Sequence, residues 1–126
     1  MIKKYNPIIY PLNIYIGIDE DVNNLLKDFT SSSDGEHIYS SWSDSHGLSY
    51  SHILDSNNEY CLVMIFEKEV SLDLVVHELA HIVYRLWEHI GETEVASEAN
   101  AYLHEWVMKC YLDFIKEYNG TSLENK

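Results

Sequence analysis

Two histidines separated by three residues, with a glutamate directly after the first, form the pattern His77-Glu78-Leu79-Ala80-His81. On a helix, residues four apart share a face and are separated by a rise of about 6 Å, so both imidazoles can bind one ion. Zinc binds neutral imidazole nitrogen, and a catalytic zinc site uses three protein ligands so that water can occupy the fourth position. The pattern predicts a zinc site with His77 and His81 as ligands and Glu78 as the base that activates water.

The positions of these histidines on their helix support this prediction. Ser71 is a suitable N-cap and Gly91 a suitable C-terminal stop, which predicts one helix from Leu72 to Ile90. Apolar residues fill one broad face of that helix, and both histidines fall on the opposite side. A solvated helix face also carries histidines, so this spacing alone leaves an ordinary surface role open.

The third metal ligand should come from a second helix, expected from about Glu94 to Tyr118. Glu98 is the preferred ligand because it borders the apolar stripe beside Tyr102, where its carboxylate can turn toward the first helix without entering the core. A straight helical hairpin would bring Tyr102 level with His81, so Glu98 requires a steep helix crossing. The other acidic candidates are Glu94, which lies farther round the helix, and Glu105, which is retained as the alternative.

A hydrolytic site often needs a further proton donor or hydrogen-bond donor for the reacting oxygen. Four side chains on the two helices have suitable chemistry, and spacing alone selects none of them: Tyr84, His89, Tyr102 and His104. An ordinary place at the border of a helix face is the alternative for each.

The elements that must position these residues indicate an α+β domain. The N-terminal segment and the alternating apolar residues at 12–18 predict a first strand, and a short helix over 19–29 should cover one sheet face. After a loop at 31–35, three strand-like runs with turns around 44–47 and 55–58 predict an antiparallel meander. Its last member, at 60–66, is apolar on both faces and should lie inside the sheet. We expect one domain over residues 1–118 and a frayed tail over 119–126.

Composition narrows the class of protein. The 126 residues carry a formal charge of -13, which repels nucleic-acid backbones and attracts cations. Cys61 and Cys110 lie among apolar residues without a CxxC motif, as expected for free thiols in a reducing cytoplasm. No apolar run approaches the roughly 20 residues that span a bilayer. We therefore expect a soluble, cytoplasmic protein that binds neither nucleic acid nor membranes.

The order of strand, helix, three-stranded sheet, H-E-x-x-H helix and glutamate-bearing helix resembles a minimal zincin of the gluzincin branch. The segment Ser97-Glu98-Ala99-Asn100-Ala101-Tyr102 is similar to the third-ligand segment of ImmA/IrrE-type peptidases. Short phage and mobile-element proteins also combine H-E-x-x-H with E-x-x-A-Y. The resemblance implies that His77, His81 and Glu98 bind zinc, that Glu78 is the general base, and that Tyr102 belongs to the catalytic site.

Three functional hypotheses follow. The first is a zinc metallopeptidase that cleaves a protein substrate, held as an extended peptide along an exposed strand beside the metal helix. The alternative is a non-catalytic protein of the kind a phage could encode, which keeps the zincin scaffold and uses its acidic surface to bind a basic host protein. A purely structural zinc site is the third, disfavoured because such sites close the fourth position with another protein ligand.

Overall fold

A computed structural model describes the chain except for residues 9, 11, 44, 92–96 and 125–126. Five strands form one mixed sheet in the order β1-β2-β5-β4-β3. The strands are β1 (Ile2–Tyr5), β2 (Asn13–Ile18), β3 (Thr30–Ser31), β4 (Gly47–Leu54) and β5 (Tyr60–Phe66). β2 and β5 run parallel, and the other neighbouring pairs are antiparallel. The expected α+β class is confirmed.

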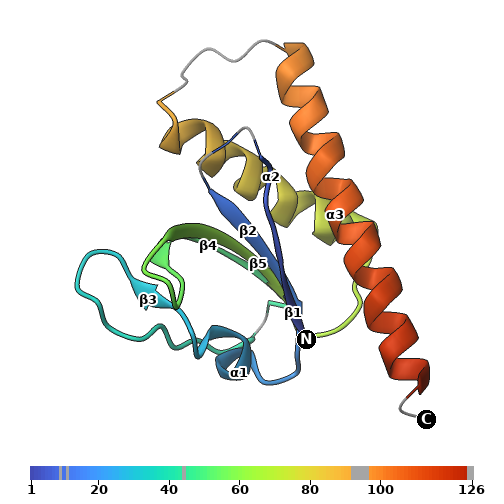
Figure 1. Cartoon of the computed structure of the whole chain (residues 1–126). Helices are drawn as coiled ribbons and strands as arrows, with labels where there is room; N and C mark the ends of the chain where they lie inside the picture. The colour runs from blue at the N-terminus through green and yellow to red at the C-terminus, as the bar shows by residue number, and fades with distance from the viewer. Residues whose placement is uncertain (9, 11, 44, 92–96, 125–126) are drawn as a thin grey trace.

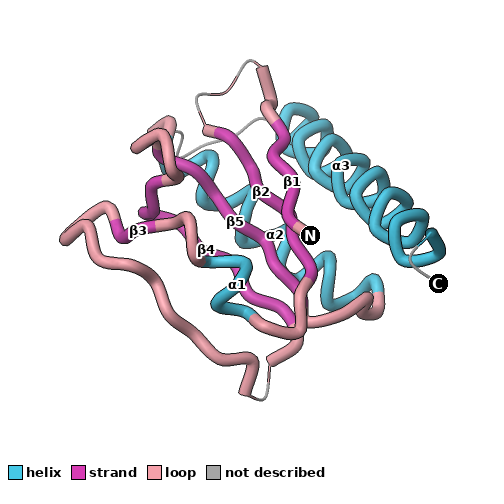
Figure 2. Tube along the Cα trace, turned by 60° about the horizontal axis from the view of Figure 1, so that its bottom comes forward, coloured by secondary structure: helices cyan, strands magenta, loops and turns pink. Residues whose placement is uncertain are grey.

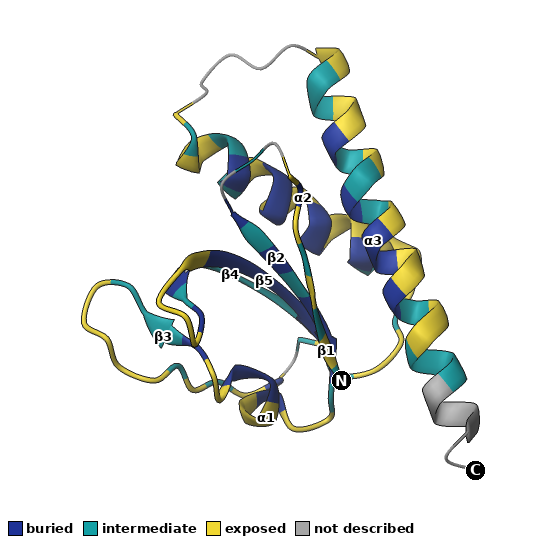
Figure 3. Ribbon diagram, in the orientation of Figure 1, coloured by how far each residue is buried: buried dark blue, intermediate teal, exposed yellow. Residues whose placement is uncertain are grey.

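Helices cover both faces of this sheet (Figures 1 and 2). The short helix α1 (Val22–Leu26) lies on one face, as expected, and the long helices α2 (Leu72–His89) and α3 (Ser97–Glu124) lie on the other. In Figure 3, buried residues lie in the central strands and on the sides of the helices that face the sheet. α2 and α3 therefore lie side by side on one face of the sheet, and both pack against its strands.

The central strand β5 explains why two hydrophobic clusters form. Successive side chains of a strand point to opposite faces. Leu62, Met64 and Phe66 therefore pack under α2 and α3, while Val63 and Ile65 pack with α1. All are buried, which confirms that 60–66 lies inside the sheet with cover on each side.

The N-terminal region contains two strands where we expected one. β1 pairs with β2 in antiparallel fashion, and the Met1 ammonium donates to the Ile18 carbonyl at 2.9 Å. β1 also attaches to α3, because Lys3 and Tyr5 both donate to the Asp113 carboxylate, at 3.1 and 2.9 Å. Asn6 and Pro7 follow β1, and the Asn6 side chain accepts from the Ile8 N–H at 2.8 Å, a local contact typical of a turn.

The prediction of a strand over residues 36–43, the first strand of the meander, is wrong. That segment makes an isolated bridge between Thr30 and His37, and the two-residue β3 precedes the loop instead. Trp42 is buried beside α1 and donates from Nε1 to the Glu20 carbonyl at 2.9 Å. Burial of this large ring packs the segment over the sheet face beside α1 instead of in the sheet, and β4 and β5 alone form the expected hairpin.

The two long helices differ in how well their ends were predicted. α2 begins and ends within a residue of the expected bounds, and Gly91 adopts a φ of 79°, as a helix stop requires. α3 continues to Glu124 instead of ending near residue 118, because Gly120 takes a helical conformation that glycine disfavours but does not forbid. Within the described residues, the helices do not combine the length and apolarity needed to cross a membrane.

Candidate active site

The two histidines of the motif lie together on the outer side of α2. Their ring centroids are 4.9 Å apart with the ring planes at 83°. Both residues are exposed, while Val75, Leu79 and Ile82 of the same helix are buried against the sheet. The predicted separation of the histidines from the apolar face is confirmed.

Glu78 is buried beside them, and its side chain makes no hydrogen bond to the described residues. Its side chain is 8% exposed, and Oε1 lies 4.0 Å from His77 Nε2, too far for a hydrogen bond. In the part of the chain that the structure describes, Glu78 Oε2 is the one buried side-chain polar atom left unpaired. Such atoms are rare because desolvation without a new hydrogen bond is unfavourable, so this carboxylate requires an explanation.

Gly47, the first residue of β4, makes the space that Glu78 occupies. A Cβ atom at Gly47 would lie 3.3 Å from Glu78 Cγ and 3.0 Å from Phe66 Cδ1. Contacts this short would force either side chain to move. Glycine at this position therefore lets α2 approach the strand closely enough to bury the glutamate, whereas the sequence marked Gly47 only as a turn residue.

One edge of β4 beside α2 has unpaired main-chain groups. Glu67 N–H donates to the His46 carbonyl at 3.1 Å, which makes residues 46 and 67 a hydrogen-bonded antiparallel pair. The alternation of such pairs turns the N–H and C=O of Gly47 and Ser49 toward the outer edge. The Gly47 carbonyl accepts from Ser45 Oγ at 2.6 Å, so the groups left for a further strand are the Gly47 N–H and the main-chain groups of Ser49. β3 pairs with β4 only at Ile53 and Leu54, so no described strand covers this edge.

A cavity of about 270 Å³ lies between β4 and α2 at His81. Ser49 and Ser51 line it from the strand, and His81 and Arg85 line it from the helix. The cavity gives a ligand access to one of the two imidazoles. Sequence reasoning missed Ser49, Ser51 and Arg85; the available signal was the four-residue spacing that places Arg85 one helical turn after His81.

The third ligand is not brought to this site in the described residues. There, no three side chains of the types His, Cys, Asp and Glu lie close enough together to hold a metal ion. Glu98 is exposed and falls on the side of α3 opposite the buried Leu103 and Val107. Glu94 lies outside the described residues. The structure joins His77, Glu78 and His81, and Glu98 as third ligand stays a prediction.

The remaining candidates on α3 lie in other surroundings. Glu105 forms an ion pair with Lys109 at 2.9 Å. Tyr102 is 62% exposed and, with Glu105, lines a groove against the β1–β2 connection that is separate from the cavity at His81. His104 Nδ1 lies 2.8 Å from the Asn100 carbonyl, an ordinary local contact. A catalytic role for Tyr102 and the alternative ligand role of Glu105 stay predictions.

Two other candidates lie on α2 itself. Tyr84 is exposed, and its ring lies 5.6 Å from the Arg85 guanidinium carbon. The His89 ring lies 5.8 Å from that of Tyr60, near the end of the helix. Neither residue lines the cavity that contains His81.

A hydrogen bond joins the last turns of α2 to the first turns of α3. Trp87 Nε1 donates to Asn100 Oδ1 at 2.9 Å, so Asn100 attaches the first turns of α3 to α2.

Comparison of the chain with known protein families, with curated proteins and with solved structures finds no match.

Proposed function

We propose that this chain is a zinc-dependent peptidase in which His77 and His81 bind the metal ion and Glu78 is the general base. The supporting observation is the buried carboxylate of Glu78, whose Oε2 has no partner among the described residues and whose Oε1 lies 4.0 Å from the His77 ring, next to that of His81. Imidazole nitrogen is a preferred zinc ligand, and a carboxylate without a structural partner is available to take a proton. These residues fit a zinc site, with Glu98 proposed as the third ligand.

Each described group has a defined part in the proposed reaction. Zinc, when bound, supplies a Lewis acid that polarises a carbonyl and makes water more acidic. Glu78 accepts the proton of the attacking water and passes it to the leaving amine. The outward N–H of Gly47 and the outward N–H and C=O of Ser49 orient an extended peptide by strand-like hydrogen bonds.

Metal binding is tested with protein purified without a histidine tag. We expect wild type to bind one zinc ion, and His77→Ala and His81→Ala to bind it at least about tenfold more weakly, because each removes a ligand. His37→Ala, which removes an exposed histidine from a distant loop, is the matched control. Equal zinc affinity of wild type and His81→Ala would end the proposal. The same measurement on Glu98→Ala decides its role as a ligand.

Hydrolysis is tested with Glu78→Gln, which retains the side-chain shape but lacks the base. Mass spectrometry of a mixed peptide library should detect cleavage by wild type and a loss of at least about a hundredfold in the variant, in the range that general-base catalysis contributes. Zinc binding by the variant should persist. Cleavage at the same rate by both proteins would contradict the assigned base.

A non-catalytic binding protein is the second candidate. The observation that favours it is the apolar groove of about 530 Å³ beside α3, which presents Tyr10, Tyr102 and Trp106 on a strongly acidic chain. Exposed apolar surface of this kind marks interaction sites. A biological effect that survives Glu78→Gln unchanged would support binding and exclude peptidase action as its cause.

A further inference from the structure

A row of hydrogen-bond donors continues from the candidate site toward the end of α2. His77, His81, Arg85 and His89 follow one another at four-residue intervals. Each step advances about 6 Å along the helix and turns about 40° around it. The row therefore winds from the outer side of α2 toward β4 and β5, where the His89 ring lies 5.8 Å from that of Tyr60.

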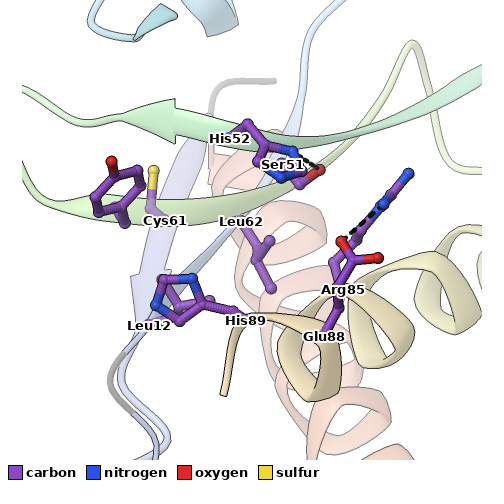
Figure 4. Close-up of a pocket in the computed structure, with 9 residues that line it drawn as sticks. Leu12, Ser51, His52, Cys61, Leu62, Arg85, Glu88 and His89 are labelled. Carbon is purple, nitrogen blue, oxygen red and sulfur yellow. Dashed lines mark hydrogen bonds and ion pairs between the residues drawn. The ribbon is translucent and has the colours of Figure 1, made fainter. Parts of the chain in front are cut away.

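A second cavity, of about 120 Å³, lies at the end of this row (Figure 4). Arg85, Glu88 and His89 line it from α2, and Ser51 and His52 line it from β4. Ser51 and Arg85 also line the cavity at His81, so the two spaces share a wall. A ligand that lies along β4 at His81 therefore meets Arg85 next.

A bulge in β4 shapes the strand side of this cavity. The pairing of β4 with β5 shifts register between Tyr50 and Ile53, and His52 has a φ of 58°. Positive φ is uncommon for residues other than glycine, and bulges redirect side chains at functional sites. Here the bulge brings two consecutive residues, Ser51 and His52, to the same cavity, with Ser51 Oγ 3.1 Å from His52 Nδ1.

A guanidinium lines this place in an otherwise acidic chain, and Glu88 of the same cavity balances its charge. Arg85 is the only arginine of a protein with a formal charge of -13, and four of its seven histidines are in the row or the cavity. Arg85 donates from Nη1 to Glu88 at 3.0 Å, which uses one of the five N–H groups of a guanidinium. The planar guanidinium matches the two oxygens of a carboxylate.

We propose that Arg85, with Ser51 and His89, binds a carboxylate of the peptide that occupies the candidate site. The identity of the ligand as a peptide rests on the proposed function. An extended peptide rises about 3.3 Å per residue, so Arg85 lies about two residues and His89 about four residues from the part of the peptide at His81. The carboxylate belongs either to an acidic side chain at this distance or to the C-terminus.

The test measures binding without requiring cleavage. Because Arg85 is the only arginine, its Nε–Hε group gives a single arginine signal in a 1H–15N NMR spectrum of the full chain. The probes are acetyl-Ala-Glu-amide, its uncharged glutamine counterpart, and acetyl-Ala-Gln with a free C-terminus. We expect at least one of the two charged probes to shift the signal with an affinity about tenfold or more above that of the uncharged one, as charge-assisted hydrogen bonds imply.

Variants assign the effect to this residue. In Arg85→Met, followed by the main-chain signals of Ser49 and Ser51, the preference for the charged probe should disappear. Arg85→Lys should retain part of it, since the charge remains but the paired N–H groups do not. Lys109→Met is the matched control, because it also removes one cation that pairs with a glutamate on its own helix, on α3. A preference that persists in Arg85→Met, or equal binding of all probes by wild type, would overturn the proposal.

Failure of this inference and failure of the proposed function give different results. Selective binding of a charged probe without any cleavage of the peptide library would retain the carboxylate site and reject the peptidase. Cleavage without selective binding would do the reverse. A preference for the glutamate probe identifies an acidic side chain, and a preference for the free C-terminus identifies a terminal carboxylate.

Discussion

Replacing Glu78 should make the metal-free protein more stable. Its carboxylate is buried, Oε2 has no hydrogen-bond partner in the described residues, and Oε1 lies 4.0 Å from the nearest histidine nitrogen. Folding thus removes a polar group from water without providing the hydrogen bond that normally offsets this cost, which lowers the free energy of unfolding. A residue kept for chemistry is expected to show this conflict with stability.

The size of the effect follows from the contacts. Methionine has the same Cβ and Cγ positions as glutamate, so Glu78→Met retains the packing of Cγ near Gly47. Leaving a buried polar group unsatisfied costs about 1–3 kcal/mol, so we expect this variant to gain up to that amount. Glu78→Gln should gain less, because its amide is uncharged but still needs partners.

Urea unfolding in the presence of a chelator measures these changes, with the fluorescence of the three tryptophans as signal. A gain of 1 kcal/mol corresponds to roughly 3–5 °C in Tm for a domain of this size. Glu36→Gln, at an exposed loop position, is the control and should change stability by less than about 0.5 kcal/mol. A loss of stability in Glu78→Met would refute the reasoning, since it would show that the carboxylate supports the fold.

Three further predictions concern Gly47 beside the site, Asp55 between β4 and β5, and the helix glycines Gly91 and Gly120. Gly47→Ala should destabilise the protein by about 1–3 kcal/mol in urea unfolding, because its Cβ would lie 3.0 Å from Phe66, and Phe66→Leu should relieve part of that loss. Burial opposes ionisation of Asp55, but hydrogen bonds from Glu59 N–H, Tyr15 and Asn57 N–H lower its pKa below the usual range of an aspartate. Its contribution is therefore complete above the pKa of the unfolded chain and is lost as the pH falls through the lower folded-state pKa, so Asp55→Asn should be less stable than wild type near neutral pH and the difference should shrink in acid. Gly91→Ala should lose about 1 kcal/mol because its φ is 79°, whereas Gly120→Ala, within a helix and with open space at Cβ, should gain about 0.5–1 kcal/mol.

The sequence predicted those elements whose local pattern agrees with their final surroundings. β5 is apolar and buried on both faces from Cys61 to Phe66, and α2 has an apolar face and a glycine stop that agree. The segment 36–43 failed because burial of Trp42 against α1 is a long-range contact that strand alternation does not reveal. The predicted end of α3 was wrong because Gly120 was interpreted as a helix stop from its local preference alone.

The candidate site likewise contains residues whose positions follow from local sequence and others whose positions depend on tertiary packing. His77, Glu78 and His81 belong to one helix, so their relative positions follow from helix geometry. Burial of Glu78 depends on Gly47, more than 30 residues earlier, and on how closely β4 approaches α2. The distance from Glu98 to the histidines depends on the crossing of two helices, which the sequence constrains only weakly. Local spacing therefore predicts the motif, whereas the cavity and any third ligand depend on tertiary packing.

Several features that weaken a fold lie together where α2 meets β4, and this supports a functional site independently of the motif. Glu78 is buried and unpaired, His52 has a positive φ, and the main-chain edge at Ser49 has no described partner strand. Each is unfavourable for folding alone, through desolvation, backbone strain or an open edge. In the rest of the described core, buried side-chain polar atoms have hydrogen-bond partners. Because such conflicts are expected where function opposes stability, a ligand is expected at this junction. The binding-protein alternative rests instead on the separate groove beside α3, and proton acceptance by Glu78 is required only of the peptidase.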